Sequence, residues 1–112
     1  MRGIKEVDVA TLLRWQEQGE HCLLFDVRSQ AEIARGIIAG ARILPLHMIP
    51  LETDTIENAA KSGKAVIYCR TGARSGQACA FMNQRGVEEV YNLRGGIVAW
   101  QHAGQVLVPP ER

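Results

Sequence analysis

The sequence predicts a single α/β domain built on a mostly parallel central sheet with helices on both of its faces. Short apolar runs of strand length alternate along the chain with segments that carry helix-capping residues and helical spacing, and this alternation is typical of parallel sheets. No internal repeat, low-complexity tract or linker rich in proline and glycine divides the 112 residues, a length that suits one domain. We therefore expect one domain over residues 1–112.

The first helix and the first buried strand are predicted from capping and apolar patterning. Asp8 is a helix-capping residue that precedes an apolar stripe, and Gly19 ends the pattern. The wholly apolar run 22–25 predicts a strand that is covered on both faces. Asp26 and Arg28 follow this strand, and we expect them to form a structural ion pair. The stripe of the helix consists of Val9, Leu12, Leu13 and Gln16.

The next segment is expected to contain two short helices and a short strand. Ser29 and Glu32 have the spacing of a capping box, which predicts a short helix at this point. Residues 43–44 resemble a short strand, which Pro45 limits because proline has no backbone N–H. Residues 52–60 are expected to form another short helix.

The second half of the chain contains the clearest strand. Residues 65–68 are apolar and β-branched at their centre. Ser75 is then expected to cap a helix that reaches about Arg85. A further strand is predicted over 87–92, and the glycine-containing turn after it leads into a last short helix through Trp100.

The charge balance excludes several classes of function. The chain carries 13 basic and 12 acidic side chains, a formal net charge of +1, whereas nucleic-acid and polybasic membrane binders need clustered positive charge. No apolar run approaches the roughly 20 residues that span a bilayer, and the first residues lack the apolar core of a signal peptide. We expect a cytoplasmic protein that binds neither nucleic acid nor membrane.

The cysteines indicate free thiols. Cys22, Cys69 and Cys79 are an odd number, no C-x-x-C pair is present, and the three histidines are scattered. A disulfide framework or a zinc site is therefore not expected, and we predict no metal and no cofactor. Cys22 and Cys79 lie in apolar surroundings that favour core packing.

Cys69 differs because it opens a loop at the carboxyl end of a predicted strand, where parallel sheets place their ligands. The free N–H groups and the dipole of the following helix favour an anion there, and Arg70 and Arg74 add two positive charges. Cysteines in such places have lowered pKa values. Gly72 lets the backbone curl, so that several amides can converge on one point. The anion is either a bound oxyanion or the Cys69 thiolate itself.

A thiolate among amides suits two chemistries, attack on phosphorus or arsenic and attack on a sulfane sulfur to give a persulfide. The phosphatase signature has five residues between cysteine and arginine, whereas only four separate Cys69 from Arg74. The shorter loop makes a smaller cup, which suits one additional sulfur atom better than a tetrahedral phosphate. A phosphatase or arsenate reductase remains an alternative at this point.

The loop 69–75, C-R-T-G-A-R-S, resembles that of the single-domain rhodanese family of thiosulfate:cyanide sulfurtransferases. Residues 24–41 resemble the family's first signature, although Ile37 stands where a histidine is common, and residues 93–100 resemble its terminal signature. These motifs span about 4–104. The resemblance implies a rhodanese-like domain over the whole chain, with its core in that range.

The resemblance also implies a two-step cycle. The Cys69 thiolate would attack the outer sulfur of thiosulfate, release sulfite and form a persulfide, which would pass its sulfur to cyanide or another thiophilic acceptor such as a thiol. The alternative is a persulfide carrier that delivers sulfur to a protein partner. Cys69 is the expected catalytic residue, and the expected substrate-binding residues are Arg70, Thr71, Gly72, Ala73, Arg74 and Ser75.

Several roles within this loop stay open. Arg74 either binds the donor or braces the loop by pairing with Asp26 or Glu32. The hydroxyl groups of Thr71 and Ser75 either donate to the persulfide or hold the turn.

Charge along the sequence also points to the loop. Residues 58–87 contain no carboxylate but five basic side chains, so that positive charge is expected to gather around the site and steer a small dianion. These are Lys61, Lys64, Arg70, Arg74 and Arg85.

Overall fold

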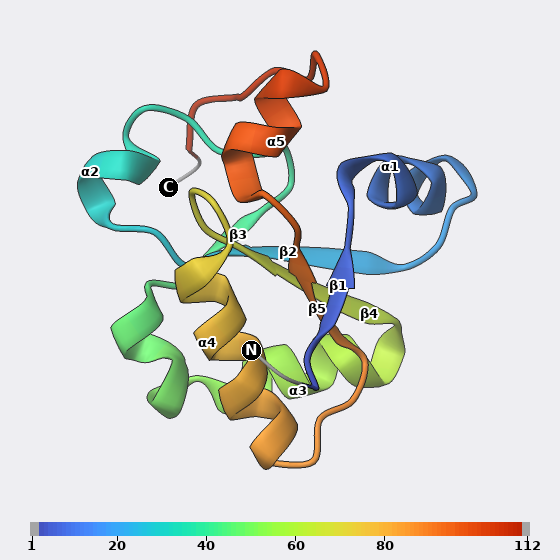
Figure 1. The fold of residues 1–112 in the computed structure, drawn as a ribbon. Helices are drawn as coiled ribbons and strands as arrows, with labels where there is room; N and C mark the ends of the chain where they lie inside the picture. The colour runs from blue at the N-terminus through green and yellow to red at the C-terminus, as the bar shows by residue number, and fades with distance from the viewer. Residues whose placement is uncertain (1–2, 111–112) are drawn as a thin grey trace.

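The computed structural model describes residues 3–110, and its centre is a five-stranded sheet (Figure 1). The strand order is β1-β5-β4-β2-β3, and every neighbouring pair is parallel. The predicted α/β fold with a parallel sheet is confirmed. The strands are β1 (Lys5–Val7), β2 (Cys22–Asp26), β3 (Arg42–Ile43), β4 (Lys64–Tyr68) and β5 (Val90–Leu93).

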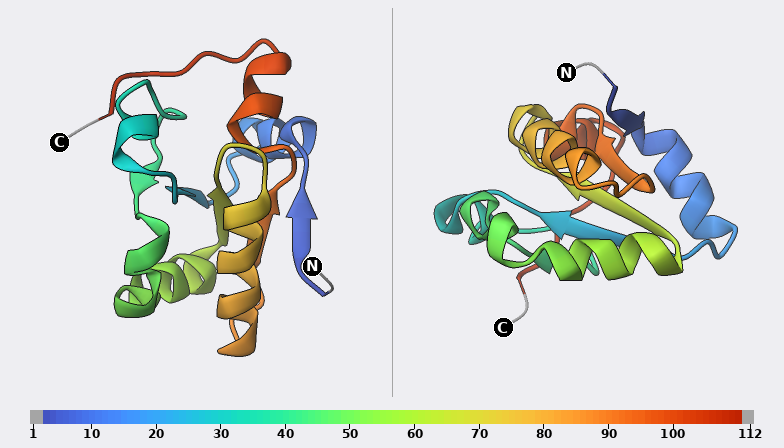
Figure 2. Two further views of the ribbon diagram at one scale, coloured as in Figure 1. Left: turned by 60° about the vertical axis from the view of Figure 1, so that its left-hand side comes forward. Right: turned by 90° about the horizontal axis from the view of Figure 1, so that it is seen from below.

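Helices cover both faces of the sheet, which lies between them in both views of Figure 2. Helices α1 (Val9–Glu17) and α5 (Gly96–His102) contribute to the core on one face. Helices α3 (Thr53–Ser62) and α4 (Ala73–Gln84) contribute to the core on the other. The remaining elements are the single-turn helix α2 (Gln30–Ile33) and the 3₁₀ helix η1 (Leu46–Leu51).

Residues 65–68 of strand β4 are apolar because both faces of the strand are covered. Val66 and Tyr68 belong to the core under α1 and α5, whereas Ala65 and Ile67 belong to the core under α3 and α4. All four side chains are fully buried. A central strand covered on both faces needs apolar residues along its buried length. Cys69 directly follows the carboxyl end of this strand.

The predicted local interactions before this strand are confirmed. The Asp8 carboxylate accepts a hydrogen bond from the Thr11 amide at 2.8 Å and caps α1. Ser29 and Glu32 form both hydrogen bonds of a capping box at the start of α2. Asp26 and Arg28 form a buried ion pair, with 2.8 Å between Oδ2 and Nη2.

Four features differ from the predictions. Strand β1 and helix η1 were not anticipated, because β1 exposes its first two residues and is held by pairing with β5. The strand predicted over 87–92 begins only at Val90, since the Val87 amide still donates to the Met82 carbonyl at the end of α4. The strand predicted over 43–44 lies one residue earlier.

Ser75 is not the cap of α4, and that prediction was wrong. The helix begins at Ala73, and its cap is Gly72, whose φ of 117° lies in the left-handed region that favours glycine. The chain therefore turns into the helix two residues before Ser75, which places the Ser75 side chain inside the protein.

No helix in residues 3–110 is long and apolar enough to cross a membrane.

Candidate active site

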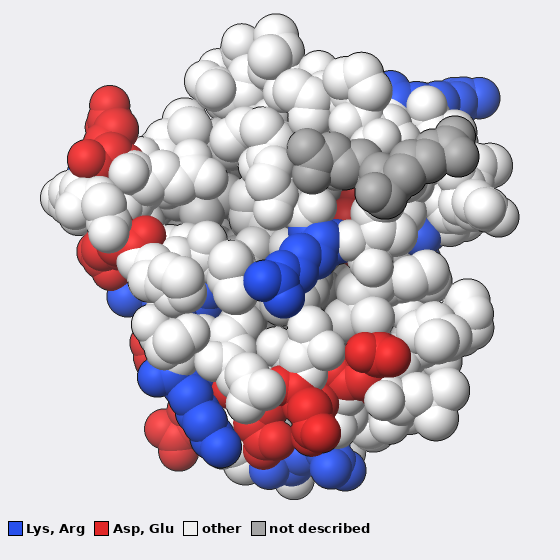
Figure 3. Space-filling model, turned by 180° about the vertical axis from the view of Figure 1, so that it is seen from behind, with Lys and Arg blue, Asp and Glu red and all other residues white. Residues whose placement is uncertain are grey.

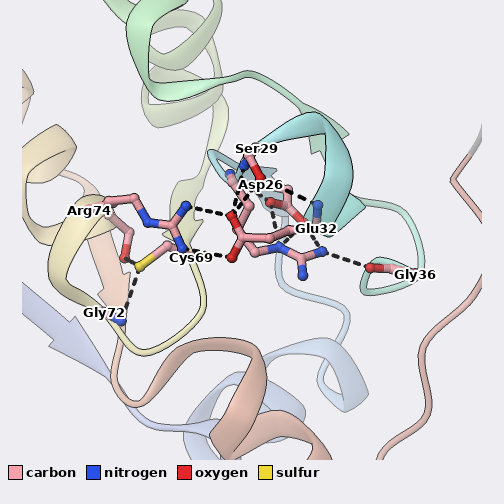
Figure 4. A network of polar contacts seen from close by, with 9 residues as sticks. Asp26, Ser29, Glu32, Gly36, Cys69, Gly72 and Arg74 are labelled. Carbon is pink, nitrogen blue, oxygen red and sulfur yellow. Dashed lines mark hydrogen bonds and ion pairs between the residues drawn. The ribbon is translucent and has the colours of Figure 1, made fainter. Parts of the chain in front are cut away.

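Cys69 lies between β4 and α4, at the centre of a turn that wraps around its sulfur (Figure 4). The side chain is only 1% exposed. The Gly72 amide donates a hydrogen bond to Sγ at 3.1 Å, and the Ser75 hydroxyl oxygen lies 3.3 Å from Sγ. Because Gly72 turns the chain, the sulfur sits at the N-terminus of the 12-residue helix α4, where the helix dipole favours an anion.

Hydrogen bonds make Cys69 more acidic than an ordinary thiol. Burial raises its pKa, but the Ser75 hydroxyl and the amides of Ser75, Gly72 and Thr71 outweigh burial and bring the pKa below the usual value. By contrast, burial raises the pKa of Cys79 to about 12 and also raises that of Cys22. The structure therefore separates one thiol with a lowered pKa from two thiols with raised pKa values.

The Ser75 hydroxyl is shared between the sulfur and a buried asparagine. Ser75 is fully buried, and its Oγ lies 2.5 Å from Oδ1 of Asn92 on β5. Asn92 is 3% exposed, and its Nδ2 donates to the Gly72 carbonyl at 3.1 Å. Because a hydroxyl has one proton, Oδ1 of Asn92 and Sγ of Cys69 compete for it. The sequence analysis missed Asn92, although a polar residue at the carboxyl end of a buried strand is the signal that could have found it.

Arg74 is braced by Glu32, one of the two partners expected for it. Nη1 and Nη2 of Arg74 donate to Oε1 and Oε2 of Glu32 at 2.6 and 2.9 Å, in the two-pronged geometry typical of arginine and carboxylate. The hydrogen bonds from Arg74 hold the pKa of Glu32 far below its usual range. Glu32 also caps α2, so the ion pair joins the first turn of α4 to α2. The other expected partner, Asp26, pairs with Arg28 instead.

Helix α5 supports the loop from the opposite side. The amides of Ile97 and Val98 donate to the carbonyls of Cys69 and Arg70 at 3.0 and 3.2 Å. Gly96 has a φ of 58°, and a Cβ at this position would collide with both carbonyl oxygens. A glycine is thus required at the start of α5 in part because no Cβ fits beside the carbonyls of the loop.

The expected concentration of five positive charges around the site is wrong. Lys61 lies near the end of α3, and Lys64 lies at the start of β4, opposite the candidate nucleophile. Arg85 is about 16 Å beyond Arg74 at a rise of about 1.5 Å per helical residue, so only Arg70 and Arg74 belong to the loop region. The face in Figure 3 mixes charges of both signs.

The other predicted residues line the outside of the turn. Arg70, Thr71 and Ala73 are exposed, and within residues 3–110 Arg70 forms no ion pair. Its guanidinium is therefore free, unlike that of Arg74. In the same range, no three histidine, cysteine, aspartate or glutamate side chains are placed to hold a metal ion.

A groove of about 960 Å³ lies next to the loop, and Arg74 is the loop residue that lines it. Cys69 is not part of its wall. The groove runs between α2 and the segment that connects β3 to η1, and the C-terminal segment contributes Pro110. Its wall consists of Val27, Arg28, Ser29, Gln30, Ile33, Ala34, Ile43, Pro45, Leu46, His47, Arg74 and Pro110.

Known proteins resemble this chain over most of its length. A family model described as a rhodanese-like domain matches residues 8–103. A protein named sulfurtransferase from Allochromatium vinosum is 46% identical over 108 residues, which cover 96% of this chain and 98% of that protein.

Solved structures show the same fold. A rhodanese-like domain protein from Staphylococcus aureus has a TM-score of 0.82 at 25% identity, and the match covers 96% of this chain and all of that chain (100%). A protein of unknown function from Rhodopseudomonas palustris, described as a possible tyrosine phosphatase, has a TM-score of 0.82 at 26% identity, with 94% and 85% covered.

Proposed function

The chain belongs to the rhodanese-like family and is a sulfurtransferase on that basis, and we propose that it moves a sulfane sulfur from thiosulfate to a thiophilic acceptor through a persulfide on Cys69. The observation that carries this proposal is the set of hydrogen bonds on the Cys69 sulfur, from the Gly72 amide and the Ser75 hydroxyl. They lower the pKa of a buried thiol and so supply the nucleophile that the reaction requires.

In the first step, the Cys69 thiolate attacks the outer sulfur of thiosulfate. A new S–S bond forms to Sγ, the S–S bond of thiosulfate breaks, and its electron pair leaves with sulfite. The terminal sulfur of the persulfide is an anion, and the amides at the start of α4 stabilise it.

In the second step, an acceptor such as cyanide or a thiol attacks that terminal sulfur. The bond to Sγ breaks, and its electron pair returns to Cys69 as a thiolate. No further oxidant or reductant is needed, because the acceptor supplies the electron pair of the new bond to sulfur and Cys69 keeps the pair of the broken bond.

Arg70 is the better candidate for binding the donor. Its side chain is exposed and free of ion pairs within residues 3–110, whereas two donors of Arg74 are engaged by Glu32. A guanidinium can donate two parallel hydrogen bonds to the sulfonate oxygens of thiosulfate. Arg74 then acts through the position of the loop.

Phosphatase chemistry is the second candidate, and the Rhodopseudomonas palustris neighbour described as a possible tyrosine phosphatase favours it. Two features of this chain oppose it. Only four residues separate Cys69 from Arg74, and the Arg74 guanidinium faces Glu32 instead of the centre of the turn. A sulfur-accepting protein partner is the alternative to a small acceptor and shares the first step.

The deciding experiment is a mass measurement after incubation with thiosulfate. We expect the protein to gain the mass of one sulfur atom, Cys69→Ser to gain nothing, and Cys79→Ser to react like the parent. Cyanide should then remove the added sulfur as thiocyanate. Absence of the adduct would overturn the proposal, and Cys69-dependent hydrolysis of an aryl phosphate would favour the phosphatase instead.

A further inference from the structure

The groove next to the loop is far larger than thiosulfate or cyanide requires. Its volume of about 960 Å³ is at the upper end of the range for sites that hold small organic molecules. We propose that the groove binds the sulfur acceptor, and that this acceptor is a small organic thiol with an apolar chain and a carboxylate. The inference rests on the proposed function, because it needs a persulfide on Cys69.

The wall of the groove has the composition that such a molecule requires. Most of the wall is apolar. Ile43 is 40% exposed, and few large apolar side chains in residues 3–110 are exposed to that extent. A bound apolar chain would cover it. The charged and titratable groups of the wall are Arg28, Arg74 and His47, and no carboxylate side chain lines it.

Arg28 offers a donor to the groove from a buried position. The residue is 5% exposed, and its Nε and Nη2 are bonded to Asp26 and to the Gly36 carbonyl. Within residues 3–110 its Nη1 has no hydrogen-bond partner. Every buried polar side-chain atom in that range does have a partner, so Nη1 is not a fully buried atom. Nη1 is therefore open to solvent beside the groove that Arg28 lines.

Arg74 offers further donors on the same wall. Each of its terminal nitrogens uses one N–H for Glu32, so that Nε and the second N–H of each terminal nitrogen remain. The charges of both arginines are offset by Asp26 and Glu32. Their free donors are what a ligand meets, and they suit a carboxylate.

The groove also lies next to the turn that carries the sulfur. Arg74 lines the groove, and the next residue, Ser75, contacts the sulfur of Cys69; in Figure 4 the Arg74 side chain lies beside Cys69 and points toward Glu32. In the reaction, the acceptor thiolate attacks the outer sulfur of the persulfide. The new S–S bond forms on the acceptor, the bond to Sγ breaks, and the electron pair remains on Cys69.

The protein is first loaded with sulfur from thiosulfate, and the excess thiosulfate is removed. The test then compares two thiols of equal chain length, mercaptohexanoate and mercaptohexanol, as acceptors. Discharge of the persulfide is followed by mass. We expect the carboxylate thiol to react about tenfold faster at low concentration, the effect of one or two charge-assisted hydrogen bonds. Hexanoate, which lacks the thiol, should slow discharge to mercaptohexanoate.

A matched pair of variants assigns the preference to the groove. Ile43→Asp places a carboxylate in the wall and should bring the two rates to parity. Leu51→Asp makes the same change at a residue that is 77% exposed outside the groove, and it should retain the preference.

Equal rates in the parent protein, or a preference that survives Ile43→Asp, would overturn the inference. Faster discharge to a neutral cysteine peptide than to either thiol would assign the groove to a polypeptide acceptor and would also overturn it. A protein that never gains sulfur from thiosulfate would instead contradict the proposed function, so the two failures are distinguishable.

Discussion

Arg74 and Glu32 form a two-pronged ion pair, with N–O distances of 2.6 and 2.9 Å, that ties the first turn of α4 to the capping box of α2. The side chains are 36% and 28% exposed, so the pair is neither deeply buried nor free in solvent. Because Arg74 directly precedes Ser75, the ion pair holds the helix turn whose hydroxyl group contacts the Cys69 sulfur.

Glu32→Gln should therefore lower the free energy of unfolding by about 1 kcal/mol at neutral pH, the range of partly exposed ion pairs. Glutamine keeps the capping box, since it can still accept from the Ser29 backbone. The pKa of Glu32 in the folded protein lies below its unfolded value of about 4.3. The pair thus stabilises fully above that pH, and its contribution disappears as the pH falls toward the folded pKa.

Denaturant unfolding at neutral pH and near pH 3 checks this prediction. The gap between the parent protein and Glu32→Gln should shrink in acid. Glu17→Gln is the control, because Glu17 is exposed and forms no ion pair within residues 3–110. A gap that is equal at both pH values would show that the charge of Glu32 is not what stabilises the loop.

Ser75→Ala should raise the pKa of Cys69, because the Ser75 hydroxyl is the largest of the contributions that lower it. A hydrogen bond to a charged group contributes about 1.5–3 kcal/mol, and its loss disfavours the thiolate. The pH profile of iodoacetamide alkylation at Cys69 should therefore shift to higher pH. Cys22 and Cys79 should stay unlabelled at neutral pH, since the pKa of each is raised.

Ser62→Ala is the matched control for this substitution. Its hydroxyl donates to the Asn58 carbonyl at the end of α3, far along the chain from the loop. An unchanged alkylation profile in Ser75→Ala would mean that the amides alone activate the thiol.

Local signals explain what could be predicted from the sequence. The caps Asp8 and Ser29 act on amides within three residues, and the strand 65–68 is apolar because of its own two faces. The Cys69 loop is likewise a continuous stretch, so its chemistry could be predicted from adjacent residues.

The missed features depend on partners far along the chain. Strand β1 exposes Lys5 and Glu6 and exists because it pairs with β5, more than eighty residues later. Asn92 reaches Ser75 and Gly72 only because β5 pairs with β4. Ser75 was wrongly predicted to be the cap because the positive φ of Gly72, three residues earlier, cannot be predicted from composition alone.

Gly96→Ala should destabilise the protein and impair the loop. A Cβ at this position would meet the carbonyl oxygens of Cys69 and Arg70, in addition to the strain of a positive φ. Gly104→Ala is the control, because Gly104 has a φ of 83° with open space around it. We expect a loss of about 1–2 kcal/mol for Gly104→Ala from conformation alone, and a clearly larger loss with slower Cys69 alkylation for Gly96→Ala. Thermal unfolding and alkylation rates measure both, and equal losses would refute the close packing of α5 on the loop.

Asn92→Asp should raise the pKa of Cys69 while changing little in volume. The aspartate keeps an oxygen for the Ser75 hydroxyl but loses the donor that holds the Gly72 carbonyl, and its charge opposes a nearby thiolate. A neighbouring like charge disfavours the charged form of a thiol and raises its pKa, so the alkylation profile should move to higher pH. Asn58→Asp, at an exposed position of α3, should leave the profile unchanged. If Asn92→Asp altered thermal stability and left the profile of Cys69 in place, Asn92 would be a packing residue only. A shift of the profile that Asn58→Asp does not share would instead show that the side chain at position 92 acts on the Cys69 thiol from β5.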